Sequence, residues 1–514
     1  MPRQKLKIKE VDEPFVNIAL DTINKNKQAL IFTSTKAGAE SCADKIARYL
    51  KDDPNLTELS EKILHTLANP TRQCERLSKA AKKGVVFHHA GLHHRQRELI
   101  EDNFRESKIK IICCTPTLAA GVDLPAFRTV LKDLKRYDGN WGVGWIPVLE
   151  YQQMAGRAGR PGKEDFGEAI AIAATENDKE NLYNKYVTGE VEDIFSKLAV
   201  EPVLRTYTLS LIATEIVGTK KQLFDFFKKT FWAHQYKDTK KIEKIVTKMI
   251  SLLSEFDFIE SKKEDFVSAD RIENEKLEAT LLGKRVAQLY IDPLTAHNLI
   301  LGIKKCPKKP SDFSVLQLIS FQLELRPLIR VKKADHEKVN EMVAEEDFLI
   351  GMPEIYDPFY SDFLDSVKTA MFFQEWISEK TEEYLLENYN IRPGEIKVKV
   401  DNADWLLYSM EELARIMQRN DLLKEIIKLR IRVKEGVKEE LIPLLRLKGI
   451  GRVRARKLFR NKIMDLKGIK EASITTLAQI IGSKTAASAK EQVGEKAEPV
   501  PERKRKGQLS LKDY

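Results

Sequence analysis

The first 190 residues alternate short apolar runs with polar loops and helical segments. Three runs have the length of strands: residues 28–33 (QALIFT), 85–87 (VVF) and 109–114 (IKIICC), the last apolar except at Lys110. Continuous apolar runs of this kind are typical of strands buried on both faces of a parallel sheet. The pattern therefore predicts an α/β domain over residues 1–190, with its functional loops at the carboxyl ends of the strands.

One interruption of this alternation has a different character. Residues 131–150 (LKDLKRYDGNWGVGWIPVLE) contain two β-prone arms around a turn rich in Gly, Asp and Asn. This composition predicts a β-hairpin inserted into the α/β domain.

After residue 190 the apolar spacing becomes helical, and the segments divide into smaller units. A helical region followed by DFVSAD and LLGKRVAQLYI predicts a winged helix over residues 191–292. Residues 293–434 are typical of a helical bundle, and residues 435–484 of a small domain around the turn Gly449–Gly451. Past Gly482 the composition shifts to Ala, Lys, Glu, Ser and Pro, which predicts a disordered basic tail over residues 485–514.

Composition narrows the function classes only modestly. Lys and Arg number 87 against 77 Asp and Glu, so the net charge of +10 suits a nucleic-acid partner without requiring one. No apolar run approaches the roughly 20 residues of a membrane span, and the N-terminal segment lacks a secretory signal. The five cysteines form no C-x-x-C pair, which favours reduced thiols and a cytoplasmic location.

One group of residue types could indicate zinc: His88, His89, His93, His94, Cys113 and Cys114. The two cysteines, however, lie in an apolar run that predicts a buried strand. We therefore predict no metal site.

The most informative chemistry lies in residues 151–162, YQQMAGRAGRPG. They contain the pattern Q-x-x-G-R-x-G-R, formed by Gln153, Gly156, Arg157, Gly159 and Arg160. Two arginines three residues apart on a glycine-rich turn present fixed cations to a phosphate group, and glycine lets the backbone approach closely. Such arginines stabilise charge that develops on a γ-phosphate. The alternative is a basic turn on the surface with no role.

A second polar loop follows the run 109–114. In TPTLAAGVDLPA, the hydroxyls of Thr115 and Thr117 can donate to a phosphate oxygen. A helical turn leads to Gly121, and Asp123 can accept from a ribose or from an arginine.

Four segments carry a family resemblance: ALIFTSTKAGAE, VVFHHAGL, TPTLAAGVDLPA and EYQQMAGRAGRPG, in this order. Together they resemble the second RecA-like motor domain of Ski-like superfamily-2 helicases, most closely the archaeal Hjm-type DNA helicases. The resemblance implies an α/β RecA-like motor domain followed by winged-helix, all-α bundle and small helix-hairpin-helix-like domains. It also implies catalytic roles for Arg157, Arg160 and Gln153, and nucleotide contacts at Gly121, Asp123, Gly156 and Gly159.

The resemblance further implies nucleic-acid contacts in the motor domain. Ser34, Thr115 and Thr117 would hold the phosphate backbone of the strand. The hairpin at residues 131–150 would separate the duplex, with Tyr137 and Trp141 stacking on the last base pair. A solvent-exposed hairpin with no role is the alternative.

Beyond the motor, the resemblance implies a ratchet helix that grips single-stranded DNA, with Trp405 as its stacking residue. The family's arginine, one heptad earlier, falls on Val398 here, so Lys397 or Lys399 would have to replace it. Trp405 as bundle core is the alternative. Around the turn 449–451, three arginines would contact a DNA phosphate: Arg452, Arg454 and Arg456.

No G-x-x-x-x-G-K-[ST] phosphate loop occurs in the sequence. We therefore expect the chain to begin at the second motor domain. ATP and Mg would be held mainly by the missing first RecA-like domain, and the chain alone would hydrolyse ATP negligibly.

The resulting hypothesis is the C-terminal part of an ATP-dependent 3′–5′ DNA helicase that acts on forked or branched DNA in replication-coupled repair and recombination. Two alternatives stay open: a non-hydrolysing DNA-binding half motor, and a Ski-like RNA helicase. The expected partners are single-stranded and forked DNA and the first RecA-like domain, with no membrane. A sliding clamp or a single-strand-binding protein is a further candidate, through the tail residues Gln508, Leu511 and Tyr514.

Overall fold

The computed structural model describes residues 8–67, 69–138, 142–160, 162, 164–262 and 275–495. The chain divides into two compact units. The first comprises residues 1–194 together with 381–398, and the second comprises residues 195–380 together with 399–514.

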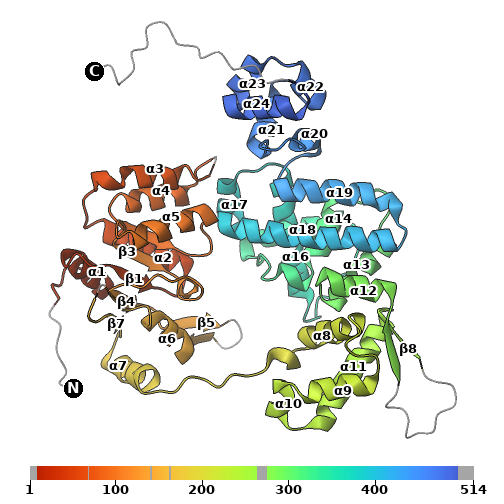
Figure 1. The fold of residues 1–514 in the computed structure, drawn as a ribbon, viewed down its shortest axis with the longest axis horizontal. Coiled ribbons are helices and arrows are strands. Elements are labelled where there is room, and N and C mark those ends of the chain that lie inside the picture. Colours follow the sequence, from red (N-terminus) through yellow and green to blue (C-terminus); the bar gives the residue numbers. More distant parts are fainter. Residues whose placement is uncertain are drawn as a thin grey trace. The chain divides into compact units, whose positions relative to one another are not determined.

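The first unit is built on a five-stranded sheet in the order β2-β3-β1-β4-β7. Figure 1 labels β1, β3, β4 and β7 of this sheet. All neighbouring strands are parallel, as the apolar runs predict. The first four strands along the chain are buried throughout, although β2 ends in His88 and β4 begins with Arg128 and Thr129. The strands are β1 (Ala29–Phe32), β2 (Val85–His88), β3 (Ile111–Cys114), β4 (Arg128–Leu131) and β7 (Glu168–Ala171).

Helices connect these strands and supply the rest of the core. Three of them begin at threonine side chains that accept a backbone N–H: Thr35 caps α2 by accepting from Gly38, Thr71 caps α4 by accepting from Cys74, and Thr175 caps α7 by accepting from Asp178. The helices are α1 (Pro14–Asn24), α2 (Lys36–Ala47), α3 (Thr57–Leu64), α4 (Arg72–Ala81), α5 (His94–Arg105), α6 (Val148–Ala155) and α7 (Glu176–Leu182).

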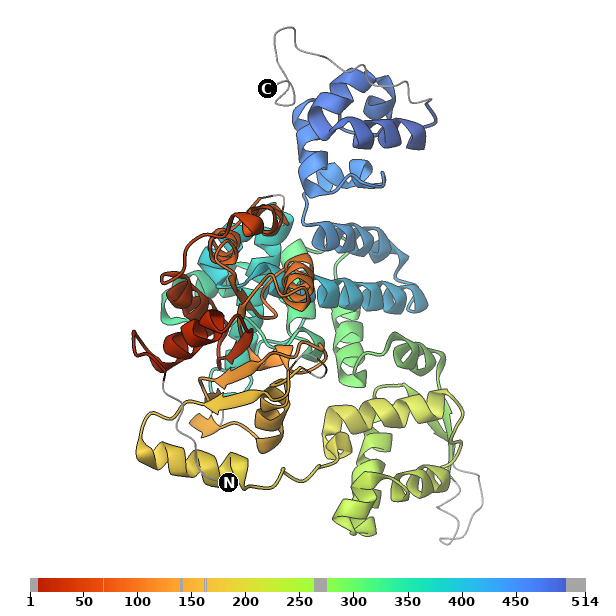
Figure 2. The ribbon, with the colours of Figure 1, turned by 60° about the vertical axis from the view of Figure 1, so that its left-hand side comes forward.

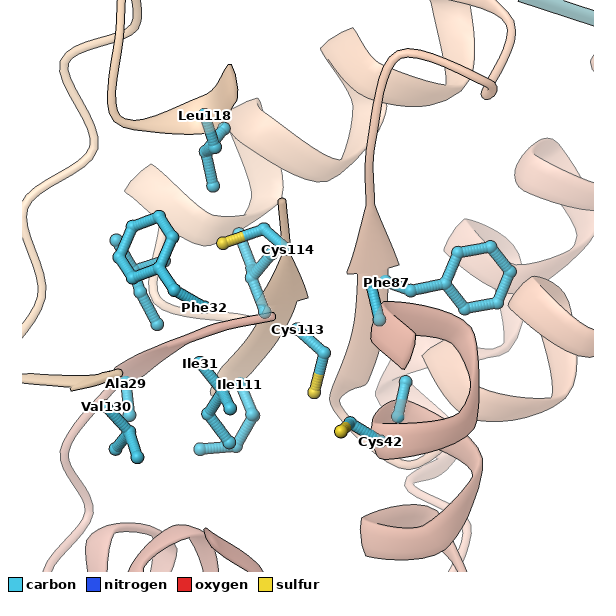
Figure 3. Packing of buried hydrophobic residues seen from close by; sticks show 14 of the residues in the cluster. Ala29, Ile31, Phe32, Cys42, Phe87, Ile111, Cys113, Cys114, Leu118 and Val130 are labelled. Atoms are coloured by element: carbon cyan, nitrogen blue, oxygen red, sulfur yellow. The ribbon is translucent and has the colours of Figure 1, made fainter. Parts of the chain in front are cut away.

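The centre of this core contains three cysteines. Figure 3 shows Cys113 and Cys114 of β3 among aliphatic side chains, with Cys42 of α2 beside Cys113. Burial raises the pKa of the Cys113 and Cys114 thiols well above the ordinary value. The thiols therefore remain protonated and act as small apolar residues.

An antiparallel pair of strands lies within the segment where a hairpin is predicted. β5 (Lys135–Asp138) pairs with β6 (Gly142–Trp145), with Lys135 opposite Trp145. The tip residue Trp141 and the side chain of Tyr137 lie outside the described residues.

The second unit begins with helices that surround a two-stranded sheet. Strands β8 (Ile259–Lys262) and β9 (Lys276–Ala279) pair antiparallel, as in a winged helix. The helices of this part are α8 (Glu201–Ala213), α9 (Lys220–Lys228), α10 (Phe231–Tyr236), α11 (Thr239–Glu255) and α12 (Leu281–Leu289).

The bundle follows, and then a small terminal group with a core of its own. Both views (Figures 1 and 2) show the terminal helices gathered into a compact group. The bundle contains α13 (Pro293–Lys305), α14 (Asp312–Ser320), α15 (His336–Glu345), α16 (Tyr360–Ile377), residues 399–416 of α18 (Pro393–Ile416) and α19 (Asn420–Glu435). The terminal group contains α20 (Ile442–Leu445), α21 (Arg452–Arg460), α22 (Leu466–Glu471), α23 (Ile474–Ile481) and α24 (Ser483–Gln492).

Two sequence predictions need correction here. The predicted disordered tail is wrong at its start, because α24 packs against α23 and buries Ala486 and Ala489. The predicted bundle contains residues 381–398, but α17 (Glu382–Tyr389) and the first turn of α18 belong to the first unit. Within the part of the chain that the structure describes, no helix combines the length and apolar character needed to cross a membrane.

We expect the buried Arg128 to be essential for the stability of the sheet. Its side chain is fully buried at the start of β4, where it pairs with Asp21 and Glu168 and donates to Thr22 at 3.0 Å. Removing one partner of a buried ion pair costs about 3–5 kcal/mol. Arg128→Ala should therefore expose Cys113 and Cys114 to thiol labelling at lower urea concentrations, measured by peptide mass spectrometry.

Arg105→Ala is the matched control, because Arg105 forms its ion pairs on the exposed surface of α5. It should change the unfolding free energy by less than about 0.5 kcal/mol. Equal labelling curves for the two variants would contradict the role of Arg128.

Candidate nucleotide and nucleic-acid sites

The Q-x-x-G-R-x-G-R turn lies at the amino ends of β1 and β4. Helix α6 ends at Ala155, and Ala158 in the following chain forms an isolated parallel β-bridge with Ala126, just before β4. The backbone N–H of Ala126 donates to the carbonyl of Arg157 at 2.9 Å, and the N–H of Gly159 donates back to Ala126 at 2.7 Å. Gly159 has φ +94°, and a Cβ on Gly167 would lie 2.2 Å from the backbone nitrogen of Gly159. This crossing therefore requires glycine on both segments.

The crossing directs Arg157 towards the loop after β3. Its guanidinium donates to the Asp123 carboxylate at 3.2 Å and to the Ala119 carbonyl at 2.7 Å. The Asp123 side chain is 91% exposed, so a phosphate can replace this carboxylate as the partner of Arg157 without disrupting the core. Gly121 lies in the same loop with φ +93°, and Gln153 is exposed near the end of α6.

Arg160 is held more firmly. Its guanidinium donates to both carboxylate oxygens of Glu164, at 2.6 and 3.3 Å, and to the side-chain oxygen of Gln28. Gln28 is itself fixed, because its amide donates to the carbonyls of Phe104 and Ile109. The Glu164 side chain is only 2% exposed, so Arg160 has to leave a buried carboxylate before it can contact a nucleotide. Sequence reasoning missed Gln28 and Glu164, since neither lies in a recognisable motif.

A cavity of about 530 Å³ opens at the opposite ends of the strands. It brings together three residues that the sequence predicts to contact nucleic acid: Ser34 after β1, and Thr115 and Thr117 after β3. The two threonine hydroxyls lie 2.9 Å apart, and the Ser34 N–H donates to Asp133 at 3.2 Å. The described lining is Ser34, Thr35, Lys36, Ala37, Ala90, Thr115, Pro116, Thr117, Arg136, Asn390 and Arg392.

The charge of this lining is one-sided. Among the described lining residues, Lys36, Arg136 and Arg392 are cationic and none is acidic. Sequence reasoning missed all three. Arg136 lies in the predicted hairpin, for which the resemblance implied only Tyr137 and Trp141 as contact residues. Arg392 comes from a segment remote in sequence. A cavity with three cations and several hydroxyls is suited to the phosphates of a nucleic-acid strand.

The two sites therefore lie at opposite edges of one sheet. Gln28, which binds Arg160, directly precedes β1, and Thr33 directly follows it. At about 3.3 Å per residue the strand separates these two residues by roughly 16 Å.

The predicted ratchet residues lie on α18. The indole N–H of Trp405 donates to the Leu289 carbonyl at 2.9 Å, and the ring is half-buried. Lys399 donates to the Pro327 carbonyl at 2.7 Å, whereas Lys397 and Val398 are exposed. The indole nitrogen of Trp405 is thus fixed by a hydrogen bond, while part of the residue stays accessible. This lies between the two alternatives for Trp405, a DNA-stacking residue and a residue of the bundle core.

The three predicted arginines of the terminal group differ in their surroundings. Arg456 pairs with Glu379, which raises its pKa above the ordinary value, and with Glu440 at 2.9 Å. Arg452 donates to the Lys380 carbonyl and lies 4.7 Å above the Trp376 ring. Arg454 is exposed and donates to the Gly449 carbonyl at 2.9 Å.

The histidines of VVFHHAGL form contacts within the first unit. His88 pairs with Glu101 at 3.0 Å, and His89 lies 3.2 Å from Glu40. Within the described ranges, no group of three or more His, Cys, Asp or Glu side chains is placed to hold a metal ion.

Comparisons with known proteins bear on the whole chain. Family models match residues 13–162 (helicase conserved C-terminal domain), 167–260 (helix-turn-helix domain), 313–436 (archaeal helicase, domain 4) and 441–495 (SAM-like helix-hairpin-helix tandem). The ATP-dependent DNA helicase Hel308 of Methanococcus vannielii is 39% identical over 508 residues, covering 91% of this chain and 66% of the relative. The Hel308 of Pyrococcus abyssi is 37% identical over 502 residues, covering 96% of this chain and 67% of the relative.

The chain belongs to the archaeal Hel308 family of superfamily-2 helicases. The family assignment predicted from the four motor segments is thereby confirmed, as is the sequence of fold classes from RecA-like domain to helix-hairpin-helix. The chain spans 66–67% of the length of these two relatives.

The Glu40 carboxylate makes the stability of the motor domain sensitive to acid. Burial alone raises its pKa, but contacts with His89, Gln73 and Arg392 outweigh burial and lower the pKa from 4.5 to about 2. A carboxylate with a lowered pKa stabilises the fold above pH 4.5, and this contribution is lost as the pH falls towards 2. We expect a loss of about 3 kcal/mol across this window.

Urea unfolding between pH 7 and pH 2.5 measures this dependence. Glu40→Gln should be less stable at pH 7 and should lose less stability on acidification. Glu176→Gln, at a side chain that is 87% exposed, is the control and should follow the parent chain. A Glu40→Gln curve parallel to that of the parent chain would show that Glu40 does not carry the effect.

Proposed function

We propose that this chain supplies the second motor domain and the DNA-guiding domains of an ATP-dependent 3′–5′ DNA helicase that acts on forked or branched DNA in replication-coupled repair and recombination. The observation that carries the proposal is the position of two phosphate-directed sites at opposite edges of one sheet. Arg157 and Arg160 lie at one edge, and the cationic cavity lies at the other.

The nucleotide edge fits one half of an ATP site. Bound ATP with Mg²⁺ supplies the phosphoryl group whose transfer to water drives the motor. Arg157 exchanges the Asp123 carboxylate for a phosphate oxygen, and Arg160 exchanges the Glu164 carboxylate for a phosphate oxygen. Each guanidinium therefore keeps an anionic partner throughout. The sequence contains no G-x-x-x-x-G-K-[ST] loop, so we propose that a first RecA-like domain has to provide the phosphate loop and most of the Mg²⁺ ligands.

At the other edge, Ser34, Thr115 and Thr117 hold consecutive phosphates of the tracking strand. The buried sheet transmits movement from one edge to the other, because its close-packed strands deform little. The β5–β6 pair separates the duplex ahead of the strand, and Trp405 stacks on a base to prevent back-slippage.

DNA-stimulated ATP hydrolysis tests this function. The chain should be inactive alone and should become active when mixed with a separately produced first RecA-like domain of the same family. In the mixture, Arg157→Ala and Arg160→Ala should each lower the turnover rate at least 100-fold, because an arginine on the transferred phosphoryl group contributes about 10³-fold or more.

The control Arg105→Ala, on the exposed surface of α5, should retain the turnover rate of the parent mixture. Activity of the chain alone would contradict the need for a first motor domain. If neither the chain nor the mixture hydrolyses ATP but fork binding persists, the result favours a non-hydrolysing DNA-binding module.

A further inference from the structure

The segment 381–398 joins the motor domain although its neighbours in sequence belong to the bundle. The backbone N–H of Arg72, at the start of α4, donates to Glu383 at 2.9 Å, and its side chain pairs with Glu387 at 3.2 Å. Lys36, in the first turn of α2, pairs with Glu395. Contacts at both ends therefore attach this segment to the motor.

Between these ion pairs the backbones touch. The N–H of Gly394 donates to the Gly91 carbonyl at 3.0 Å. A Cβ on Gly394 would lie 2.3 Å from the Ala90 carbonyl oxygen, and a Cβ on Gly91 would lie 2.4 Å from Cδ of Arg392. Both glycines are needed for this approach, and the space left by Gly91 lets the Arg392 side chain pass to the cavity.

Arg392 is anchored at one nitrogen. Its Nε donates to Glu40 at 3.1 Å, and Glu40 also binds Gln73 at 2.9 Å and Arg76 at 2.6 Å. The Glu40 side chain is 7% exposed and that of Arg392 is 13% exposed. The two terminal nitrogens of Arg392 make no hydrogen bond with the residues that the structure describes, and the side chain lines the cavity beside Ser34 and Thr117.

We propose that Arg392 is a further phosphate-binding residue for the DNA strand, contributed to the motor's cavity by the segment that begins helix α18. Nε stays on Glu40, and the two terminal amino groups bind one phosphodiester. Arg392 directly precedes α18 (Pro393–Ile416) and Trp405 lies on it, so one helix follows the phosphate contact and carries the stacking residue. This inference rests on the proposed function as a DNA helicase.

A purely structural role would give Arg392 the single task of neutralising Glu40. Arg76 provides the comparison, because it binds the same carboxylate at 2.6 Å but is absent from the described lining of the cavity. Substitutions of the two arginines remove the same charge from the same buried partner. Only loss of Arg392 should remove a phosphate contact.

The test measures binding of the full chain to a fluorescein-labelled 20-nucleotide oligo-dT by anisotropy, from 50 to 300 mM NaCl. Each phosphate contact on a single strand contributes about 0.7 to the slope of log K against log salt concentration. Arg392→Ala should lower the slope by about 0.7 and weaken binding by roughly 5–10-fold at 100 mM salt. Arg76→Ala should leave the slope unchanged.

Arg392→Lys keeps the charge and guards against misfolding of the alanine variant. It should retain the slope but bind more weakly, because lysine cannot form the bidentate contact. Suppose that the parent chain binds the oligonucleotide. An unchanged slope in Arg392→Ala, or parent-like affinity in Arg392→Lys, would then overturn the role of Arg392 but not the proposed function. A parent chain without salt-dependent binding to the oligonucleotide overturns the proposed function as well.

Discussion

The burial of β1 between β3 and β4 is the constraint on which the sites depend. Its four residues are at most 1% exposed, and they are paired on both sides along their whole length. Because the strand cannot shift without breaking both ladders, the residue before it and the residues after it hold a fixed separation. Gln28 organises the arginine edge, and Thr33 and Ser34 begin the cavity edge. A shift of one residue would also turn every side chain of the strand to the opposite face.

The buried carboxylate of Glu40 fixes the position of the start of α18 on the motor domain. Three side chains surround Glu40: Gln73 from α4, His89 from the loop after β2, and Arg392 from the segment 381–398. A lone carboxylate in this position would be strongly destabilising, so the donors are needed together. The resulting network ties the start of α18 to the same loops that line the cavity.

Much of the motor domain could be predicted from the sequence, because its signals are local. Continuous apolar runs predicted β1, β2 and β3, and Ser34, Thr115 and Thr117 meet because parallel strands end at the same edge. The predicted tail was wrong at residues 485–492, because small residues such as Ala486 and Ala489 resemble a disordered composition but allow close helix packing. Arg392 and Glu40 could not be predicted, since their roles depend on contacts between segments distant in the chain. Glu164 lies four residues after Arg160, but its burial could not be predicted, because a charged residue alone indicates only solvent exposure.

We propose that a DNA strand binds at one edge of the sheet and that the nucleotide binds at the other edge. Hydrogen–deuterium exchange of the full chain, with and without a saturating single-stranded oligonucleotide, tests it directly. Binding should slow exchange in residues 33–37, 115–118 and 389–393, and should change exchange little in residues 120–126 and 156–160. Protection concentrated at the arginine edge, or absent from all three cavity segments while binding is complete, would contradict it.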